Sequence, residues 1–147
     1  MEIRPARPGD GPRIVELIRL LARFENLPEP SDDDARRLLR HAFEERRLDF
    51  WVAEQGPEVV AYAACFTAYS TFRARPTLFL EDLFVHPSAR RRGVATALLA
   101  HLRRVAEERG CGRFEWMVLD WNRGAQALYT GIGAALLPEW RLVRIDL

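Results

Sequence analysis

Apolar side chains recur along the first third of this chain at the spacing of a helix. From Asp10 onward the apolar stripe consists of Ile14, Leu17, Ile18, Leu21 and Phe24. Pro28 and Pro30 end this predicted helix, because proline cannot continue the backbone hydrogen bonds. Ser31 and Asp34 form the pattern of a capping box, which predicts a second helix with apolar positions at Ala35, Leu38, Leu39, Ala42 and Phe43.

Shorter apolar runs between turn residues predict strands. They cover Met1–Pro5, Phe50–Glu54, Val59–Tyr69, Leu78–Val85, Phe114–Leu119 and Trp140–Leu147. Two further helices are predicted over Val94–Arg109, ended by Gly110 and Gly112, and over Gly124–Tyr129. A strand, a helix and a strand in succession require one parallel crossover. We therefore expect an α/β (α+β) fold, in which helices flank a mixed, mostly antiparallel twisted sheet.

Length, charge and cysteine content limit the classes of protein that fit. The 147 residues, 48% of them hydrophobic, predict one domain over residues 1–147. With 22 basic and 21 acidic side chains, no overall field attracts nucleic acid or an anionic membrane. Cys65 and Cys111 lack the spacing of a disulfide scaffold or a zinc site, so we expect a cytoplasmic protein without a metal. No apolar run approaches the roughly 20 residues of a membrane span.

The candidate chemistry lies where the fourth predicted strand passes through a basic turn into a helix. The turn and first helical positions, Arg90 to Thr96, present backbone N–H groups at a helix start, which favours an anion. Gly93 lets the backbone approach a phosphate. The pattern Arg-x-x-Gly-x-Ala matches neither a Walker loop nor a dinucleotide fingerprint. It predicts a phosphate cradle of another kind, and a solvated basic loop is the alternative.

This strand, turn and helix resemble the acetyl-CoA signature of the GNAT superfamily of N-acetyltransferases. The resemblance extends over nearly the whole chain to the diamine branch, which contains the spermidine/spermine and thialysine acetyltransferases. It is carried by Ile3–Ala6, Leu21–Glu25, Phe66–Phe72, Glu81-Asp82, Asp120–Asn122, Tyr129 and Trp140–Leu142. It implies the GNAT fold, acetyl-CoA as cosubstrate without a metal, a small primary amine as acceptor, and a homodimer in which the tail pairs with a partner.

By the same resemblance, the cofactor-binding residues fall into three groups. Backbone groups of Leu83, Phe84 and Val85 pair with the pantetheine amides, as an added strand would. The turn contributes Arg90, Arg91, Arg92, Gly93, Val94, Ala95 and Thr96. The last group is Asn122, Ala125 and Tyr129. Asn122 has two possible roles, which are a hydrogen bond to the pantetheine arm and a cap on the short helix.

Amine acetylation requires a proton acceptor. A primary alkylammonium has a pKa of roughly 10.4, so on the order of one molecule in a thousand is the free amine at pH 7. Glu81 is the leading candidate, because it lies near the end of the central strand beside the cofactor turn. The alternative for Glu81 is a surface carboxylate paired with an arginine. Asp82 points to the opposite face if the strand is regular, and only a bulge would change that.

The leaving thiolate requires a proton donor. A tyrosine with a pKa of about 10 supplies a proton to a thiolate whose thiol has a pKa of about 8.5. Tyr129 fits this role by resemblance, because it follows Asn122 at the family's spacing. The alternative is a core tyrosine whose hydroxyl reaches the surface.

The acceptor-binding residues are expected to be Phe24, Glu25, Glu81 and Asp82, with Glu25 alternatively an exposed acid at a helix end. Arg73 and Arg75 would repel a long polycation and suit an acceptor that carries a carboxylate, so both polyamines and thialysine-like or lysine-like acceptors fit. Other functions that fit the pattern are acetylation of an aminoglycoside or a protein N-terminus, and a non-catalytic acyl-CoA sensor.

Overall fold

The computed structural model describes residues 1–147, and the chain divides into two compact units, Met1–Met117 and Val118–Leu147. The first unit is built on a sheet whose strands lie in chain order. They are β1 (Glu2–Pro5), β2 (Asp49–Gln55), β3 (Glu58–Ser70), β4 (Arg75–Val85) and β5 (Arg113–Trp116). β1 to β4 pair antiparallel, and β4 pairs parallel with β5. The predicted mixed sheet with one parallel crossover is confirmed.

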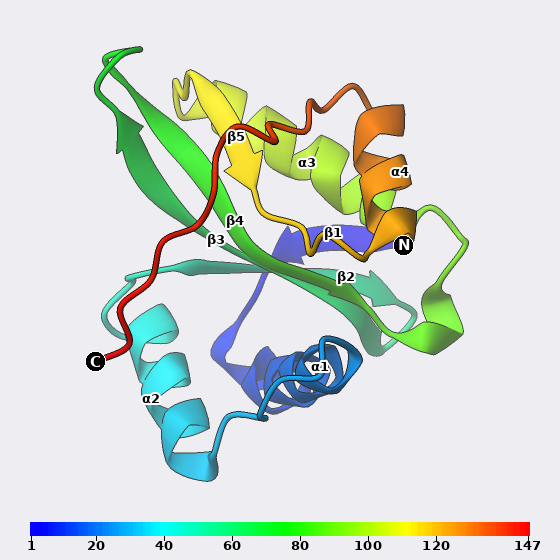
Figure 1. The fold of residues 1–147 in the computed structure, drawn as a ribbon. Coiled ribbons are helices and arrows are strands. Elements are labelled where there is room, and N and C mark those ends of the chain that lie inside the picture. Colours follow the sequence, from blue (N-terminus) through cyan, green and yellow to red (C-terminus); the bar gives the residue numbers. More distant parts are fainter. The chain divides into compact units, whose positions relative to one another are not determined.

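Helices cover both faces of this sheet (Figure 1). α1 (Gly11–Phe24) and α2 (Asp32–Phe43) lie on one face, and α3 (Val94–Glu108) lies on the other. The first core is formed mainly by Ile14 and Leu17 of α1 against Val52, Tyr62 and Phe84 of the sheet. The second core packs Val94 and Leu98 of α3 against Ala53, Ala61 and Val85. The period of the apolar positions therefore predicted which side of each helix is buried.

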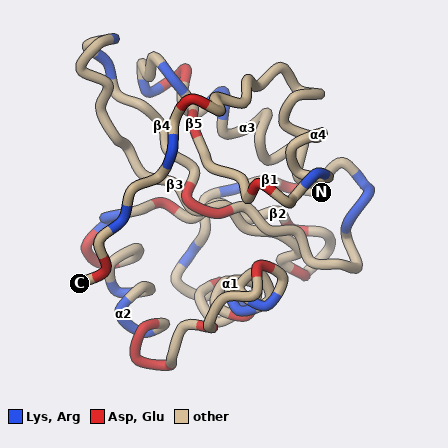
Figure 2. The backbone as a smooth tube through the Cα atoms, viewed as in Figure 1, with Lys and Arg blue, Asp and Glu red and all other residues tan.

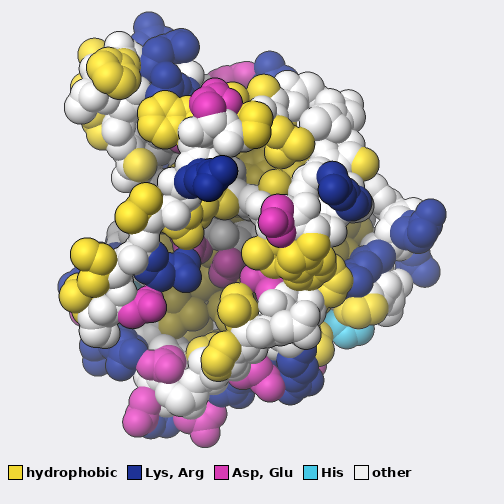
Figure 3. Space-filling view, in the orientation of Figure 1, with side chains coloured by type: hydrophobic (Ala, Val, Ile, Leu, Met, Phe, Trp, Pro, Cys, Tyr) yellow, Lys and Arg dark blue, Asp and Glu magenta, His cyan; other side chains and the backbone are white.

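Local polar contacts fix the start of each N-terminal element. The Ser31 hydroxyl accepts the Asp34 N–H at 3.1 Å, and the Asp34 carboxylate accepts the Ser31 N–H at 3.4 Å, which confirms the predicted capping box. The acidic first turn of α2 forms the magenta group at the lower edge of Figure 3. The nearly buried Arg4 guanidinium donates to Asp10 at 2.8 Å and to Glu54 at 3.0 Å, and so ties β1 to the short 3-10 helix Pro8–Asp10 and to β2.

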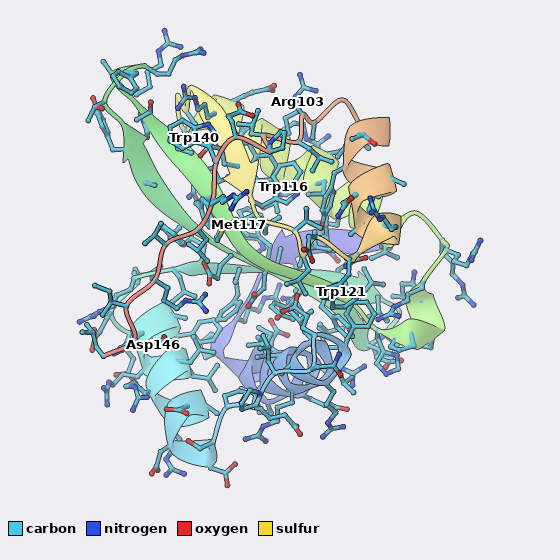
Figure 4. The ribbon with its side chains drawn as sticks, in the orientation of Figure 1. Arg103, Trp116, Met117, Trp121, Trp140 and Asp146 are labelled. Carbon is cyan, nitrogen blue, oxygen red and sulfur yellow. The ribbon has the colours of Figure 1, made fainter.

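β4 carries the irregularity that matters most for function. Leu80 lies opposite Cys65 and Asp82 lies opposite Ala64, so Glu81 has no opposite residue in β3 and forms a bulge. The pairing of β4 with β5 ends just before this point, at Leu80 and Trp116. Trp116 is labelled at the end of β5 in Figure 4. Beyond Leu80, β4 is paired with β3 alone.

The second unit contains one helix, α4 (Arg123–Gly131). The predicted strand over Trp140–Leu147 is wrong, because residues 141–147 adopt neither helix nor strand and Trp140 is 74% exposed (Figure 4). Alternating apolar residues make a strand only where a neighbouring strand supplies hydrogen bonds, and the ladder of this sheet ends at β5. The run predicted over Phe114–Leu119 is likewise a strand only where it pairs, from Arg113 to Trp116. No helix is both long and apolar enough to cross a membrane.

Candidate active site

The turn before α3 has the backbone of an anion cradle. Ala89 and Val94 are only 1% and 2% exposed and fix its two ends in the core. Between them, Arg91 and Gly93 adopt left-handed φ values of 60° and 77°. The first intrahelical bond runs from the Ala97 N–H to the Gly93 carbonyl at 2.9 Å, and no side chain caps the helix. The N–H groups at the start of α3 therefore lack intrahelical acceptors, as an anion site requires.

Gly93 is suited to close approach by a ligand. A Cβ placed on Gly93 meets nothing within 4 Å, so space in front of the turn is open. A side chain at this φ would be strained, because the left-handed region places Cβ against the backbone. The basic turn is blue in Figure 2, in the loop that leads into α3. Its charge and donors fit a pyrophosphate.

The structure directs the Arg90 side chain away from this cradle. Its Nε donates to the Val85 carbonyl at 3.0 Å. Its guanidinium carbon lies 5.6 Å from the centre of the Phe24 ring and 5.2 Å from that of Phe84, both within cation–π range. The Arg90 N–H is also bonded, to the Pro87 carbonyl at 3.3 Å. Arg90 thus links the turn to β4 and to the end of α1.

The edge of β4 beyond the bulge offers backbone groups to a ligand. His86 donates its N–H to its opposite residue, Val60, at 2.8 Å. Because hydrogen-bonded pairs alternate in an antiparallel ladder, Asp82 and Phe84 bond to β3, and the N–H and C=O of Leu83 and Val85 point the other way. The Leu83 main chain and the Val85 N–H thus fit the predicted role toward pantetheine, whereas the Val85 carbonyl already accepts from Arg90 Nε. The main chain of Phe84 does not fit it, because β3 already uses that main chain.

The bulge brings two carboxylates to one region of the sheet. Asp82 lies opposite Ala64, on the face where Tyr62 and Phe84 pack under α1. The bulge is the case in which the simple alternation of Glu81 and Asp82 was expected to fail, because the extra residue shifts the alternation by one position. Both residues form the red stretch in the middle of β4 in Figure 2. Glu25, directly after α1, is close enough for its charge to act on Asp82.

Burial and like charges make Asp82 an unusual carboxyl group. Burial raises its pKa most, and the charges of Glu81 and Glu25 raise it further, to about 6. The Tyr62 hydroxyl, which donates to Asp82 Oδ2 at 3.4 Å, acts in the opposite direction. Burial also raises the pKa of Glu25. The cluster is thus a region of concentrated negative charge that a cation would stabilise.

Tyr62 was not identified from the sequence. It lies in the apolar run Val59–Cys65, where a tyrosine is read as another core residue. The one sequence feature that could have singled out Tyr62 is its polar hydroxyl group within a run of apolar residues, which predicts a strand buried on both faces. The structure shows that the hydroxyl belongs to the carboxylate cluster.

Two predicted neighbours of the site are too far from it. Arg73 lies in the β3–β4 turn and Arg75 begins β4. Arg75 precedes Glu81 by six positions, a distance of about 20 Å along a strand. These arginines therefore do not reach the carboxylate of a small amino acid whose amine lies at Glu81.

In the second unit, the predicted cofactor-binding residues Asn122, Ala125 and Tyr129 lie at the N-cap and within α4. Asn122 Oδ1 accepts the Ala125 N–H at 3.1 Å, so the capping role foreseen for Asn122 is observed. The same bond occupies the Ala125 N–H, which is therefore not available to the cofactor. Tyr129 lies half-buried in the last turns of the helix.

Comparisons with known proteins agree with this geometry. Residues 14–134 match the Acetyltransferase (GNAT) family. This chain belongs to the GNAT family. It is 35% identical to thialysine N-ε-acetyltransferase of Bos taurus, over 98% of this chain and 91% of the relative. It is 37% identical to L-ornithine N5-acetyltransferase of Arabidopsis thaliana over 87 residues, which are 59% of this chain and 38% of the relative.

Solved structures give the same fold. A probable acetyltransferase superposes with a TM-score of 0.87 at 21% identity, covering 100% of this chain and 98% of that one. The GNAT enzyme described here is therefore an acetyl-CoA-dependent N-acetyltransferase with the fold expected of its family.

The pKa of Asp82 predicts how this GNAT enzyme responds to acid. Below about pH 6 the Asp82 carboxyl is protonated and its charge is lost, whereas above that pH it is ionised. We expect kcat/KM for a cationic amine to fall about tenfold per pH unit below that point. The measurement is kcat/KM between pH 5 and 8 at saturating acetyl-CoA. The Asp82→Asn variant should lose this acid limb, and an unchanged limb in the variant would assign it to another group.

Proposed function

We propose that this enzyme transfers the acetyl group of acetyl-CoA to a primary amine of a small cationic molecule, a polyamine or diamine or a thialysine-like amino acid. The observation that supports this most is the convergence of Glu25, Glu81 and Asp82 at the bulge of β4. The bulge directly follows the last residue paired with β5, so the cluster borders the open edge suited to the acyl arm. A primary ammonium supplies the opposite charge.

The proposed reaction is a direct attack. The turn from Arg91 to Thr96 holds the pyrophosphate, and the edge at Leu83 and Val85 holds the pantetheine arm. Glu81 takes a proton from the ammonium, directly or through water, and the free nitrogen attacks the thioester carbonyl. The tetrahedral intermediate breaks its carbon–sulfur bond, Tyr129 protonates the leaving thiolate, and the second proton of the nitrogen passes to solvent. Tyr129 regains a proton from solvent and Glu81 releases its proton there, so one proton is released overall. The products are the acetamide and coenzyme A.

The relatives favour one subclass of acceptor. The Bos taurus protein is named for the ε-amine of thialysine, and the Arabidopsis thaliana protein for the N5 amine of L-ornithine. Each name specifies a side-chain amine of an amino acid. We propose such a terminal amine as the acceptor, with polyamines as the second candidate. The support for polyamines is a spermidine/spermine N(1)-acetyltransferase-like protein of Homo sapiens, which is 28% identical over 99% of this chain and 22% of its own length.

The proposal treats residues 1–147 as one catalytic domain. It is supported by the family match, which runs from residue 14 to residue 134 and so includes parts of both compact units. Assembly as a homodimer and a cytoplasmic setting stay predictions.

An amine panel tests the proposal. The enzyme is incubated with acetyl-CoA and, separately, thialysine, ornithine, lysine, putrescine, spermidine, an aminoglycoside and a peptide with a free N-terminus, and thiol release is followed. We expect saturable release with thialysine or the other small cationic amines. Release with the aminoglycoside or the peptide alone would replace the proposed acceptor class. A flat response with all acceptors, together with tight coenzyme A binding, would favour an acyl-CoA sensor.

A further inference from the structure

Tyr62 occupies a position that packing alone does not explain. It lies in β3 with 0% of its surface exposed, and its ring meets the edge of Phe50 with centroids 6.1 Å apart. A phenylalanine would fill this core equally well. The hydroxyl is therefore an added polar group in a buried place, where it is costly unless it finds a hydrogen-bond partner.

The bulge at Glu81 provides that partner. With Glu81 left out of the ladder, Asp82 lies opposite Ala64 and shares a face with Tyr62, which lies opposite Phe84. Residues in this diagonal relation on neighbouring strands are within reach of a long side chain. The Tyr62 hydroxyl donates to Asp82 Oδ2 at 3.4 Å. In a regular ladder, counted from Leu80 and Cys65, Asp82 would lie on the other face and the contact would be lost.

We propose that Tyr62 is a positioning residue of the acceptor site. Its hydroxyl keeps the Asp82 carboxylate oriented and ionised, so that Asp82 binds the cationic form of the acceptor amine. The proposal rests on the proposed function, because it assigns Asp82 to the acceptor site. It assigns no proton transfer to Tyr62. Glu81 remains the proton acceptor.

The groups around Asp82 explain why a donor is needed. Glu81 on the same strand and Glu25 after α1 are both negative, and burial adds to their effect, so all three favour a proton on Asp82. The Tyr62 hydroxyl, from β3, is the contact that favours the ionised form. Without it, the carboxyl takes up its proton at a higher pH. The enzyme then loses negative charge at neutral pH, where the acceptor is almost fully cationic.

The test compares Tyr62→Phe with Tyr69→Phe, the same change on the same strand at a side chain that is 66% exposed. For Tyr62→Phe we expect KM for thialysine to rise about twofold at pH 7 and about fivefold at pH 6, with kcat within about twofold and coenzyme A affinity unchanged. The acid limb of kcat/KM should move upward by about one pH unit, so the difference from wild type narrows at pH 8.5. Tyr69→Phe should behave as wild type.

A loss in kcat/KM that is equal at every pH would overturn the proposal, because a packing defect has no titration. An unchanged KM and pH profile would overturn it too. A second measurement needs no acceptor: the pKa of the Asp82 carboxyl is determined by carbon NMR titration in both variants. Tyr62→Phe should raise this pKa, and Tyr69→Phe should not. If wild type acetylates no small amine but this NMR shift is present, the proposed function fails while the contact stands. If the shift is absent, Tyr62 does not act on Asp82.

Discussion

Replacing Tyr129 with phenylalanine is expected to lower kcat by about a hundredfold to ten-thousandfold while leaving the affinity for acetyl-CoA within about twofold. The change removes one hydroxyl and keeps the ring, so α4 retains its packing. Coenzyme A must then leave as an unprotonated thiolate or wait for a proton from water. The expected loss corresponds to about 3–5 kcal/mol of transition-state stabilisation.

Two measurements separate this role from a structural one. Single-turnover rates of thiol release report the chemical step, and calorimetry reports the affinity for acetyl-CoA. Tyr69→Phe on β3 is the control for the loss of a tyrosine hydroxyl. If Tyr129→Phe turned over as wild type does, Tyr129 would be a core residue and the general acid would have to be sought elsewhere.

Replacing Glu81 with glutamine has the second large expected effect. The amide has nearly the shape of the carboxylate but does not accept the ammonium proton, so only the small free fraction of the amine reacts at pH 7. We expect kcat/KM to fall about a hundredfold to a thousandfold. The rate of the variant should recover about tenfold per pH unit as the pH rises toward the pKa of the amine, since solvent then removes the proton.

The pH dependence is the decisive part of this experiment. Rates of wild type and Glu81→Gln are compared from pH 7 to 10 at saturating acetyl-CoA. Glu107→Gln is the control, because Glu107 lies on α3 and pairs with Arg103 at 3.1 Å. A loss in Glu81→Gln that does not shrink with pH would show that the carboxylate binds or orients the amine without taking its proton.

The fold was predictable where each segment carries its own signal. The apolar stripe of α1, the capping box of α2 and the Gly93 turn before α3 depend on residues a few positions apart, and they form as predicted. The strand predicted at the C-terminus does not form, because a strand requires backbone hydrogen bonds from a neighbouring strand. Residues 141–147 alternate correctly but are not paired in this sheet.

The sequence proposes residue types for the candidate site but not the geometry that brings them together. Glu25, Glu81 and Asp82 were named from the resemblance. The bulge that gathers them depends on the register between β3 and β4, which cannot be read from the residues of either strand alone. For the same reason Tyr62 was overlooked as a partner of Asp82. Arg90 was assigned to the phosphate from its place in the motif, whereas its side chain lies against Phe24 and Phe84. Side-chain direction depends on what surrounds the motif in space.

Cofactor binding depends most on the turn at Gly93, and a calorimetric titration of coenzyme A tests this directly. Gly93→Ala is compared with Gly110→Ala, since both glycines have left-handed φ values, 77° and 71°, and open space at Cβ, but they lie at opposite ends of α3. Each change should cost about 1 kcal/mol of folding stability. We predict one saturable site in wild type and in Gly110→Ala, and at least tenfold weaker binding in Gly93→Ala. No saturable binding to wild type, or equal binding to both variants, would contradict the account.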